Sequence, residues 1–239
     1  MKSKLAWFSR LPFSVAFRLF LLYLIRKIVK LQVFFSFSEF SEDLIVDNFE
    51  LPKKGVYVDV GCNHPINFSN TFGLYLRGWE GIAIDANKEL VSQFKRIRKK
   101  DICICAAVSD EVRDVVFYKG NNDLVSTIDE DYYQGGYDWW QKNTVEKVVM
   151  KTRRLSDILS EYLGSDKNID VLSVDVEGHD LNVLKSLDFL VYRPEIILAE
   201  SRSLIGIENN KIHQFLTKNG YELQSFSGLT SVYKSGIKN

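Results

Sequence analysis

The order of apolar runs and helix-like segments constrains the fold of this chain more than any other feature. Five runs rich in β-branched and apolar residues, typical of buried strands, lie at 55–60, 81–86, 102–108, 169–178 and 193–200. Helical patterns lie at 71–78, 88–100, 155–164, 179–190 and 210–220. Runs 114–120 and 146–155 indicate edge strands, and the C-terminal runs indicate a hairpin around Gly228. This alternation predicts an α/β fold with a Rossmann-like, doubly wound, mainly parallel sheet and helices on both faces.

Charge divides the chain into two parts. Residues 1–38 contain no acid, and their basic residues are Lys2, Lys4, Arg10, Arg18, Arg26, Lys27 and Lys30. The whole chain has 31 basic and 31 acidic residues, so residues 39–239 carry a formal net charge of −7. We expect a basic, aromatic N-terminal helical extension at 1–43 and one catalytic domain at 44–239. An acidic body is poorly suited to a nucleic acid backbone, so nucleic acid is not expected as a partner.

The N-terminal extension leaves two interpretations open. Its unbroken apolar run, 19–25, is too short for a membrane-spanning helix, and no signal-peptide cleavage site follows it. It forms either a helix that packs on the domain or on a partner subunit, or a basic helix in peripheral contact with an anionic membrane through residues 1–38. We prefer packing, because Arg10, Arg18 and Arg26 drift around a helix instead of forming a stripe.

The three cysteines bear on the compartment. They form no plausible disulfide framework, which favours a reducing, cytoplasmic location, with the inner membrane face as the alternative for peripheral contact.

Acidic side chains follow three of the predicted strands. Asp59 ends the first, Asp85 the second, and Asp175 and Glu177 the fourth. Ligands of such sheets bind beyond the carboxyl ends of the strands, so these acids are expected at one site.

The glycine pattern restricts the ligand. A dinucleotide-binding turn needs G-x-G-x-x-G, whereas Gly61 stands alone, with Asn63 and Pro65 where further glycines would fall. The ligand therefore lacks a diphosphate but still has a ribose, whose two hydroxyls Asp85 can bind. S-adenosylmethionine fits, with its methionine portion against the Asp59–Asn63 turn. An oxidoreductase is disfavoured.

The chain resembles the FkbM-type methyltransferases from about Lys54 to Ser235. The resemblance rests on five segments: VYVDVGCNHPINFSNT, YLRGWEGIAIDAN, AAVSD, LSVDVEGHDLNVLKSLDF and YRPEIILAE. It implies a class I methyltransferase fold, S-adenosylmethionine as cofactor and O-methylation of sugars or natural-product hydroxyls. The cofactor-binding residues that it implies are Asp59, Gly61, Asn63, Asp85, Ala86, Val108, Ser109 and Asp175. Asn70 is expected to cap the following helix rather than line the pocket.

A sugar hydroxyl is a very weak acid, so a general base is expected. His179 is the first candidate, because its ordinary pKa permits base work at neutral pH, and Glu177 is the alternative or the group that orients it. His179 could equally be only the first residue of a helix. A divalent metal held by Asp175, Glu177 and Asp180 is a further option that we do not prefer, and no metal site is predicted.

The segment 121–145 carries five aromatic residues, namely Tyr132, Tyr133, Tyr137, Trp139 and Trp140. A long insertion of this kind favours a lid that binds a sugar acceptor, and a homo-oligomer contact is the alternative. The chain is thus expected to be an S-adenosylmethionine-dependent O-methyltransferase acting on a sugar, glycan or glycosylated intermediate. The alternative function is a non-catalytic scaffold that retains the cofactor pocket.

Overall fold

A computed structural model describes residues 10–29, 36–121, 126–135, 144–163, 168–202 and 204–237. One large sheet forms its centre, with strand order β3-β2-β1-β7-β8-β10-β9. The first five of these strands are parallel, and β10 and β9 close the sheet as an antiparallel hairpin. The bounds are β1 Val56–Val60, β2 Glu80–Asp85, β3 Ile102–Cys105, β7 Val171–Val174, β8 Ile196–Glu200, β9 Tyr221–Ser227 and β10 Thr230–Ser235. The predicted fold class and hairpin are confirmed.

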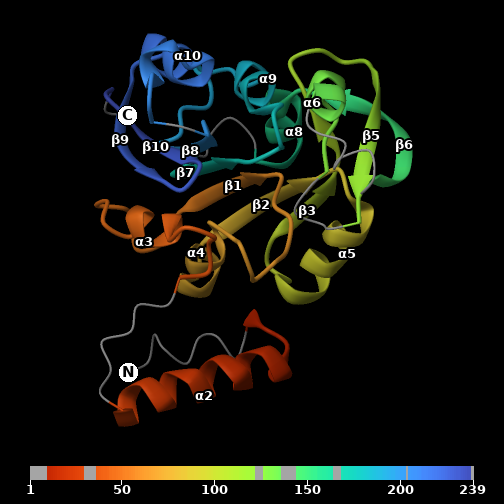
Figure 1. Cartoon of the computed structure of the whole chain (residues 1–239). Coiled ribbons are helices and arrows are strands. Elements are labelled where there is room, and N and C mark those ends of the chain that lie inside the picture. The colour runs from red at the N-terminus through yellow and green to blue at the C-terminus, as the bar shows by residue number, and fades with distance from the viewer. Residues whose placement is uncertain are drawn as a thin grey trace.

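Helices cover both faces of this sheet (Figure 1). One face carries α8, α9 and α10, and the other carries α3, α4 and α5, with α2 outside them. The helix bounds are α2 Phe13–Val29, α3 Glu42–Val46, α4 Phe72–Arg77, α5 Lys88–Ile97, α6 Glu130–Gly135, α8 Leu155–Tyr162, α9 Asp180–Lys185 and α10 Lys211–Lys218, with a 3₁₀ turn η1 at Ile207–Asn209.

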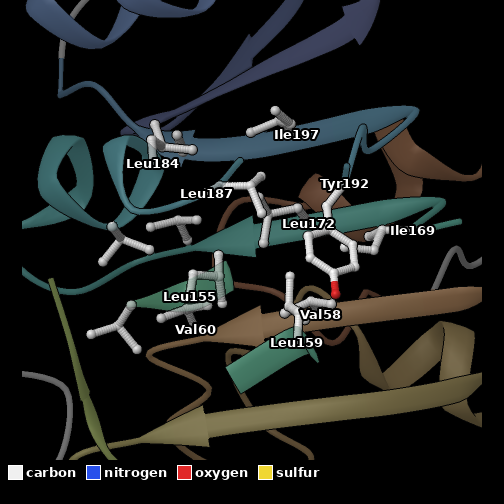
Figure 2. Close-up of a cluster of buried hydrophobic side chains, with 14 of the residues drawn as sticks. Val58, Val60, Leu155, Leu159, Ile169, Leu172, Leu184, Leu187, Tyr192 and Ile197 are labelled. Carbon is white, nitrogen blue, oxygen red and sulfur yellow. The ribbon is translucent and has the colours of Figure 1, made fainter. Parts of the chain in front are cut away.

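The alternation of side chains along β1 explains the two apolar layers. Val58 and Val60 pack with Leu155 and Leu159 of α8 on one face (Figure 2), whereas Tyr57 packs with the α4 side on the other. Successive residues of a strand point to opposite faces, so a strand that is apolar throughout is one that helices cover on both sides.

Three sequence predictions differ from the structure. The run 102–108 is two strands, because after Ala106 the chain leaves the large sheet and β4 (Ala107–Val108) pairs with β6. The runs expected as edge strands are β5 (Asp114–Gly120) and β6 (Thr144–Arg153), which with β4 form a separate three-stranded sheet. The run 169–178 is a strand only as far as Val174, because Glu177 and Gly178 have positive φ angles of 53° and 96° and form a turn.

The N-terminal helix packs on the body through its beginning. Leu11 and Ala16 are buried in the same apolar cluster as Trp79 and Tyr75. Nη2 of Arg10 donates to the carbonyl oxygen of Trp79 at 2.9 Å, and the Arg10 guanidinium lies over the Tyr75 ring. None of the helices formed by the described residues has the length and apolar character of a membrane-spanning helix.

Candidate active site

The carboxyl ends of β1, β2 and β7 surround one cavity. The strand order reverses at β1, which pairs with β2 on one side and β7 on the other, and such a point is where open α/β sheets bind ligands. The predicted site residues that line this cavity are Asp59, Gly61, Asn63, Asp85, Ala86, Val108, Asp175 and Glu177. Two predicted residues, Ser109 and His179, do not line it.

The turn after β1 depends on Gly61. Its φ angle is +79°, and a Cβ atom added there would lie 1.8 Å from the carbonyl oxygen of Asp175. Only glycine therefore lets the tip of β1 approach the end of β7 this closely. The close approach places the turn beside Asp175, whose pKa burial raises well above its usual range.

The carboxylate of Asp85 is oriented by the backbone on both sides. Oδ2 accepts a 3.0 Å hydrogen bond from the amide of Asn63, and Oδ1 accepts a 2.7 Å hydrogen bond from the amide of Asn87. These two bonds fix the plane of the carboxylate at the end of β2, between the turn after β1 and the start of α5. The sequence analysis predicted Asp85 as a site residue but did not predict Asn87.

Asn87 has two functions that its neighbours reveal. Its Oδ1 accepts from the amide of Glu89 and caps α5. Its Nδ2 is buried without a hydrogen-bond partner among the described residues, although the residue lines the cavity. A buried donor left unpaired costs free energy, so this amide is suited to a ligand acceptor. An asparagine directly before a helix is typical of an N-cap, so the sequence pattern alone does not indicate that Asn87 also lines a cavity.

The cavity is acidic at one part and apolar at another. Seven carboxylic acids line it, namely Glu39, Glu42, Asp59, Asp85, Asp175, Glu177 and Glu200. No lysine, arginine or histidine of the described residues does so. The apolar part includes Val108 together with Leu90 and Phe117, which were not predicted. This composition suits an uncharged ring system joined to a cationic group and disfavours a diphosphate.

Glu177 lies where the cavity meets the insertion between β5 and β6. Its Oε2 accepts a 3.0 Å hydrogen bond from the hydroxyl of Tyr132 in α6, and Nη2 of Arg202 is 3.6 Å from the same oxygen. Burial and the negative charge of Glu200 raise the pKa of Glu177 to about 7. A carboxylate with such a pKa can accept a proton at neutral pH.

His179 does not line the main cavity. Its Nε2 is 2.9 Å from Oγ of Ser109, its Nδ1 is 3.6 Å from Oδ2 of Asp129, and burial lowers its pKa. The ring borders a second cavity, and Ile128 borders both cavities. Ser109 thus contacts the imidazole rather than the main cavity. The base role of His179 stays a prediction, and the geometry favours Glu177.

The insertion contributes to the cavity through residues 126–128. Oγ1 of Thr127 donates to the carbonyl oxygen of Glu177 at 2.9 Å, which joins the insertion to the turn after β7. Tyr133 is buried and stacks on Tyr118, with ring centroids 3.8 Å apart, so it supports the insertion. The other three predicted aromatics, Tyr137, Trp139 and Trp140, lie outside the described residues.

The segment before α3 also reaches the cavity, and no pattern in the sequence predicts this contact. Glu39, Phe40 and Glu42 line it, and Phe40 packs against the β9–β10 turn at Gly228. A Cβ atom at Gly228 would lie 2.0 Å from the Phe40 ring.

Two further expectations concern Asn70 and a metal. Asn70 lines the cavity and its Nδ2 donates to Oγ of Ser173 at 3.2 Å, whereas Thr71 occupies the N-cap of α4, so the prediction that Asn70 caps this helix is wrong.

Of the acids considered for a metal, Asp175 and Glu177 line the cavity and Asp180 does not. Within the described part of the chain, no group of three or more His, Cys, Asp or Glu residues is placed to hold a metal ion.

The chain has a mainly parallel α/β sheet of the class I methyltransferase fold, with an acidic cavity at the switch point. Residues 59–223 match the family model of the methyltransferase FkbM domain, which is more than half of the chain. The chain therefore belongs to the FkbM methyltransferase family, and the resemblance found in the sequence is confirmed.

Comparison with solved structures finds the methyltransferase FkbM from Methylobacillus flagellatus KT, with 11% sequence identity and a TM-score of 0.47. The match covers 79% of this chain and 45% of that chain, so this chain spans less than half of that protein's length. No curated protein matches the sequence.

Proposed function

We propose that this chain is an S-adenosylmethionine-dependent O-methyltransferase that methylates a hydroxyl of a sugar, a glycan or a glycosylated intermediate. The observation that carries the proposal is the presence of two differently tuned carboxylates in one cavity. Asp85 is oriented by two backbone amides at the end of β2, and Glu177, with a pKa of about 7, lines the same cavity beside Tyr132 of α6.

The residues present fit this cofactor. The two oxygens of Asp85 can accept from the ribose hydroxyls, and the unpaired Nδ2 of Asn87 can donate beside them. Val108, Leu90 and Phe117 offer an apolar surface for the adenine ring. The turn at Gly61 and the acids around it suit the methionine portion. When bound, the cofactor supplies a methyl group on a cationic sulfur that is its own leaving group.

The residues of the chain then have to position the acceptor and remove its proton. Glu177 accepts the hydroxyl proton, and its Tyr132 hydrogen bond holds the carboxylate at a fixed orientation. Arg202 limits how far the pKa of Glu177 rises, because its charge opposes the effect of burial. Holding two reactants at near-attack distance supplies much of the acceleration in such transfers.

The mouth of the cavity supports a sugar acceptor. The rings of Phe40 and Phe68 remain 41% and 51% exposed although both line the cavity. Glu39 and Thr230 line it as well and provide hydrogen-bonding groups. Aromatic faces beside carboxylate and hydroxyl groups match a sugar ring, which has apolar faces and hydroxyl edges.

Calorimetry with S-adenosylhomocysteine and, in parallel, NADH tests the cofactor assignment. Wild type and the exposed-site control Asp157→Ala should bind S-adenosylhomocysteine alike, whereas Asp85→Ala should lose at least about tenfold in affinity, since two charge-assisted hydrogen bonds disappear. NADH should not bind. Transfer of a labelled methyl group to a panel of free and lipid-linked sugars then tests the acceptor. Failure of wild type to bind S-adenosylhomocysteine would favour the scaffold function.

A further inference from the structure

The helix α2 presents an apolar face to solvent. Its exposed large side chains are Phe13 (76%), Phe17 (50%), Leu21 (48%), Leu22 (46%) and Ile25 (48%). Phe13, Phe17, Leu21 and Ile25 are four residues apart, so at 3.6 residues per turn they span only about 120° of the helix. The opposite face carries Val15, Ala16 and Leu19, which pack in the apolar cluster of the body.

Basic side chains border this exposed face on both sides. Viewed along the helix axis at 3.6 residues per turn, Arg18 lies about 20° beyond Ile25 at one edge of the face. Lys27 lies about 40° beyond Phe13 at the other edge. Both are exposed. Arg10, which the sequence pattern grouped with Arg18, lies before α2 and bonds to Trp79, so it does not interrupt the face. An apolar stripe between two cations matches the boundary between lipid chains and phosphate groups.

The charge distribution of the chain determines which side of the protein an anionic surface attracts. Residues 1–38 contain seven basic residues and no acid, whereas residues 39–239 carry a net charge of −7. An anionic surface therefore attracts the α2 region and repels the body. A second copy of the same face is a poorer partner, because pairing two copies would bring Arg18 and Lys27 near their counterparts without any acid on α2.

We propose that the Phe13–Ile25 face of α2 is a docking surface for a membrane containing anionic phospholipids, on which the chain lies peripherally. The helix lies in the interface plane, its phenylalanine and leucine side chains enter the acyl region, and Arg18 and Lys27 contact phosphate groups. This surface is independent of methyl transfer, so the inference stands whether or not the proposed activity is correct.

Co-sedimentation with vesicles tests this surface. Vesicles of phosphatidylcholine alone are compared with vesicles that also contain phosphatidylglycerol, using the full chain. Wild type should bind the anionic vesicles at least about tenfold more tightly than the neutral ones, and added salt should weaken binding. Phe17→Ser with Leu21→Ser should abolish binding, and Arg18→Gln with Lys27→Gln should weaken binding to the anionic vesicles while leaving binding to the neutral vesicles unchanged.

A matched control separates this face from general stickiness. Leu190 and Val149 are 97% and 73% exposed outside α2, so Leu190→Ser with Val149→Ser should bind vesicles like wild type. Thermal unfolding should show that all variants fold, because each changed side chain is at least partly in water. Absence of wild-type binding to anionic vesicles would overturn the proposal. So would equal binding to both vesicles, or a dimer in gel filtration that Phe17→Ser with Leu21→Ser dissociates.

Discussion

Nη1 of Arg98 donates a 2.8 Å hydrogen bond to Oγ1 of Thr71, and this hydroxyl donates a 2.5 Å hydrogen bond to Oδ2 of Asp59. All three residues are buried. Nε of Arg98 also donates to the carbonyl oxygen of Pro65 at 2.7 Å, and Nη2 donates to Oγ of Ser69 at 2.5 Å. One buried cation therefore holds the segment between β1 and α4 at three points, and this segment follows directly on the turn at the cavity.

Replacing Arg98 should weaken folding and cofactor binding together. Oδ2 of the buried Asp101 also lies 3.8 Å from Nη1 of Arg98. Arg98→Met leaves Asp59 and Asp101 without their buried cation, so the free energy of unfolding should fall by about 3–5 kcal/mol. Urea unfolding measures this, and calorimetry should show weaker S-adenosylhomocysteine binding. The exposed Arg96 on the same helix provides the control, and Arg96→Met should change neither quantity. An Arg98→Met protein with wild-type stability would show that this network is dispensable.

Two glycines that lie close in the sequence should respond in opposite ways to alanine. Gly61→Ala meets the Asp175 carbonyl oxygen in a backbone conformation with positive φ, so it should cost about 3 kcal/mol or more and abolish cofactor binding. Gly73 is inside α4 with open space around its Cα, so Gly73→Ala should stabilise by about 0.5–1 kcal/mol. Thermal unfolding and calorimetry compare them. Equal effects would refute the close approach of β1 and β7.

The pH dependence of methyl transfer should report Glu177. Burial raises the pKa of Glu177 to about 7, and only the carboxylate accepts a proton, so kcat/KM should rise with pH and level off above about pH 7. Glu177→Gln should lower kcat by about 10²-fold or more and remove this limb, with S-adenosylhomocysteine affinity unchanged. The exposed Glu222→Gln serves as control. A limb that persists in Glu177→Gln would move the base to another group, His179 first.

Stability should fall between about pH 4 and pH 8 because of Asp180. Burial, reinforced by the charge of Glu200, raises the pKa of Asp180 to about 8. The unfolded chain releases this proton near the ordinary pKa of about 3.9, so the folded state binds more protons between the two values. Stability from this group is therefore present at acid pH and is lost as the pH rises through about 8.

Asp180→Asn cannot ionise and should lose less stability between pH 5 and pH 9 than wild type, by on the order of 4 kcal/mol. Urea unfolding across this range measures the difference, and the exposed Asp157→Asn should follow wild type. A parallel decline in Asp180→Asn would mean that Asp180 titrates normally.

The sequence was sufficient where local pattern and topology determine position. Apolar runs between helices identify the parallel strands, and acids at strand ends must meet at one edge of such a sheet, which is why Asp59, Asp85 and Asp175 were found. It was insufficient where a turn decides the direction of a side chain. The positive φ angles of Glu177 and Gly178 end β7 early, and alternation along a strand cannot anticipate that the chain then carries His179 to a second cavity.

Residues brought in by distant segments were also missed. Phe40 reaches the cavity because Gly228 leaves room for its ring, a relationship across nearly the whole chain that no spacing rule expresses. Asn87 caps α5, and the same side chain also borders the cavity, although the sequence analysis did not name it as a site residue. When a residue both caps a helix and lines a cavity, a single sequence indicates only the cap, which is the more common role of asparagine at that position.

The strands β4, β5 and β6 form a sheet separate from the large one, and of the described residues between β5 and β6, residues 126–128 line the cavity. The parallel strands and the turn at Gly61 do not depend on the length of that excursion. If the proposed function is correct, exchanging the β5–β6 insertion is expected to change the acceptor while the residues proposed to bind the cofactor stay in place, which makes this segment the one to graft in an engineered variant.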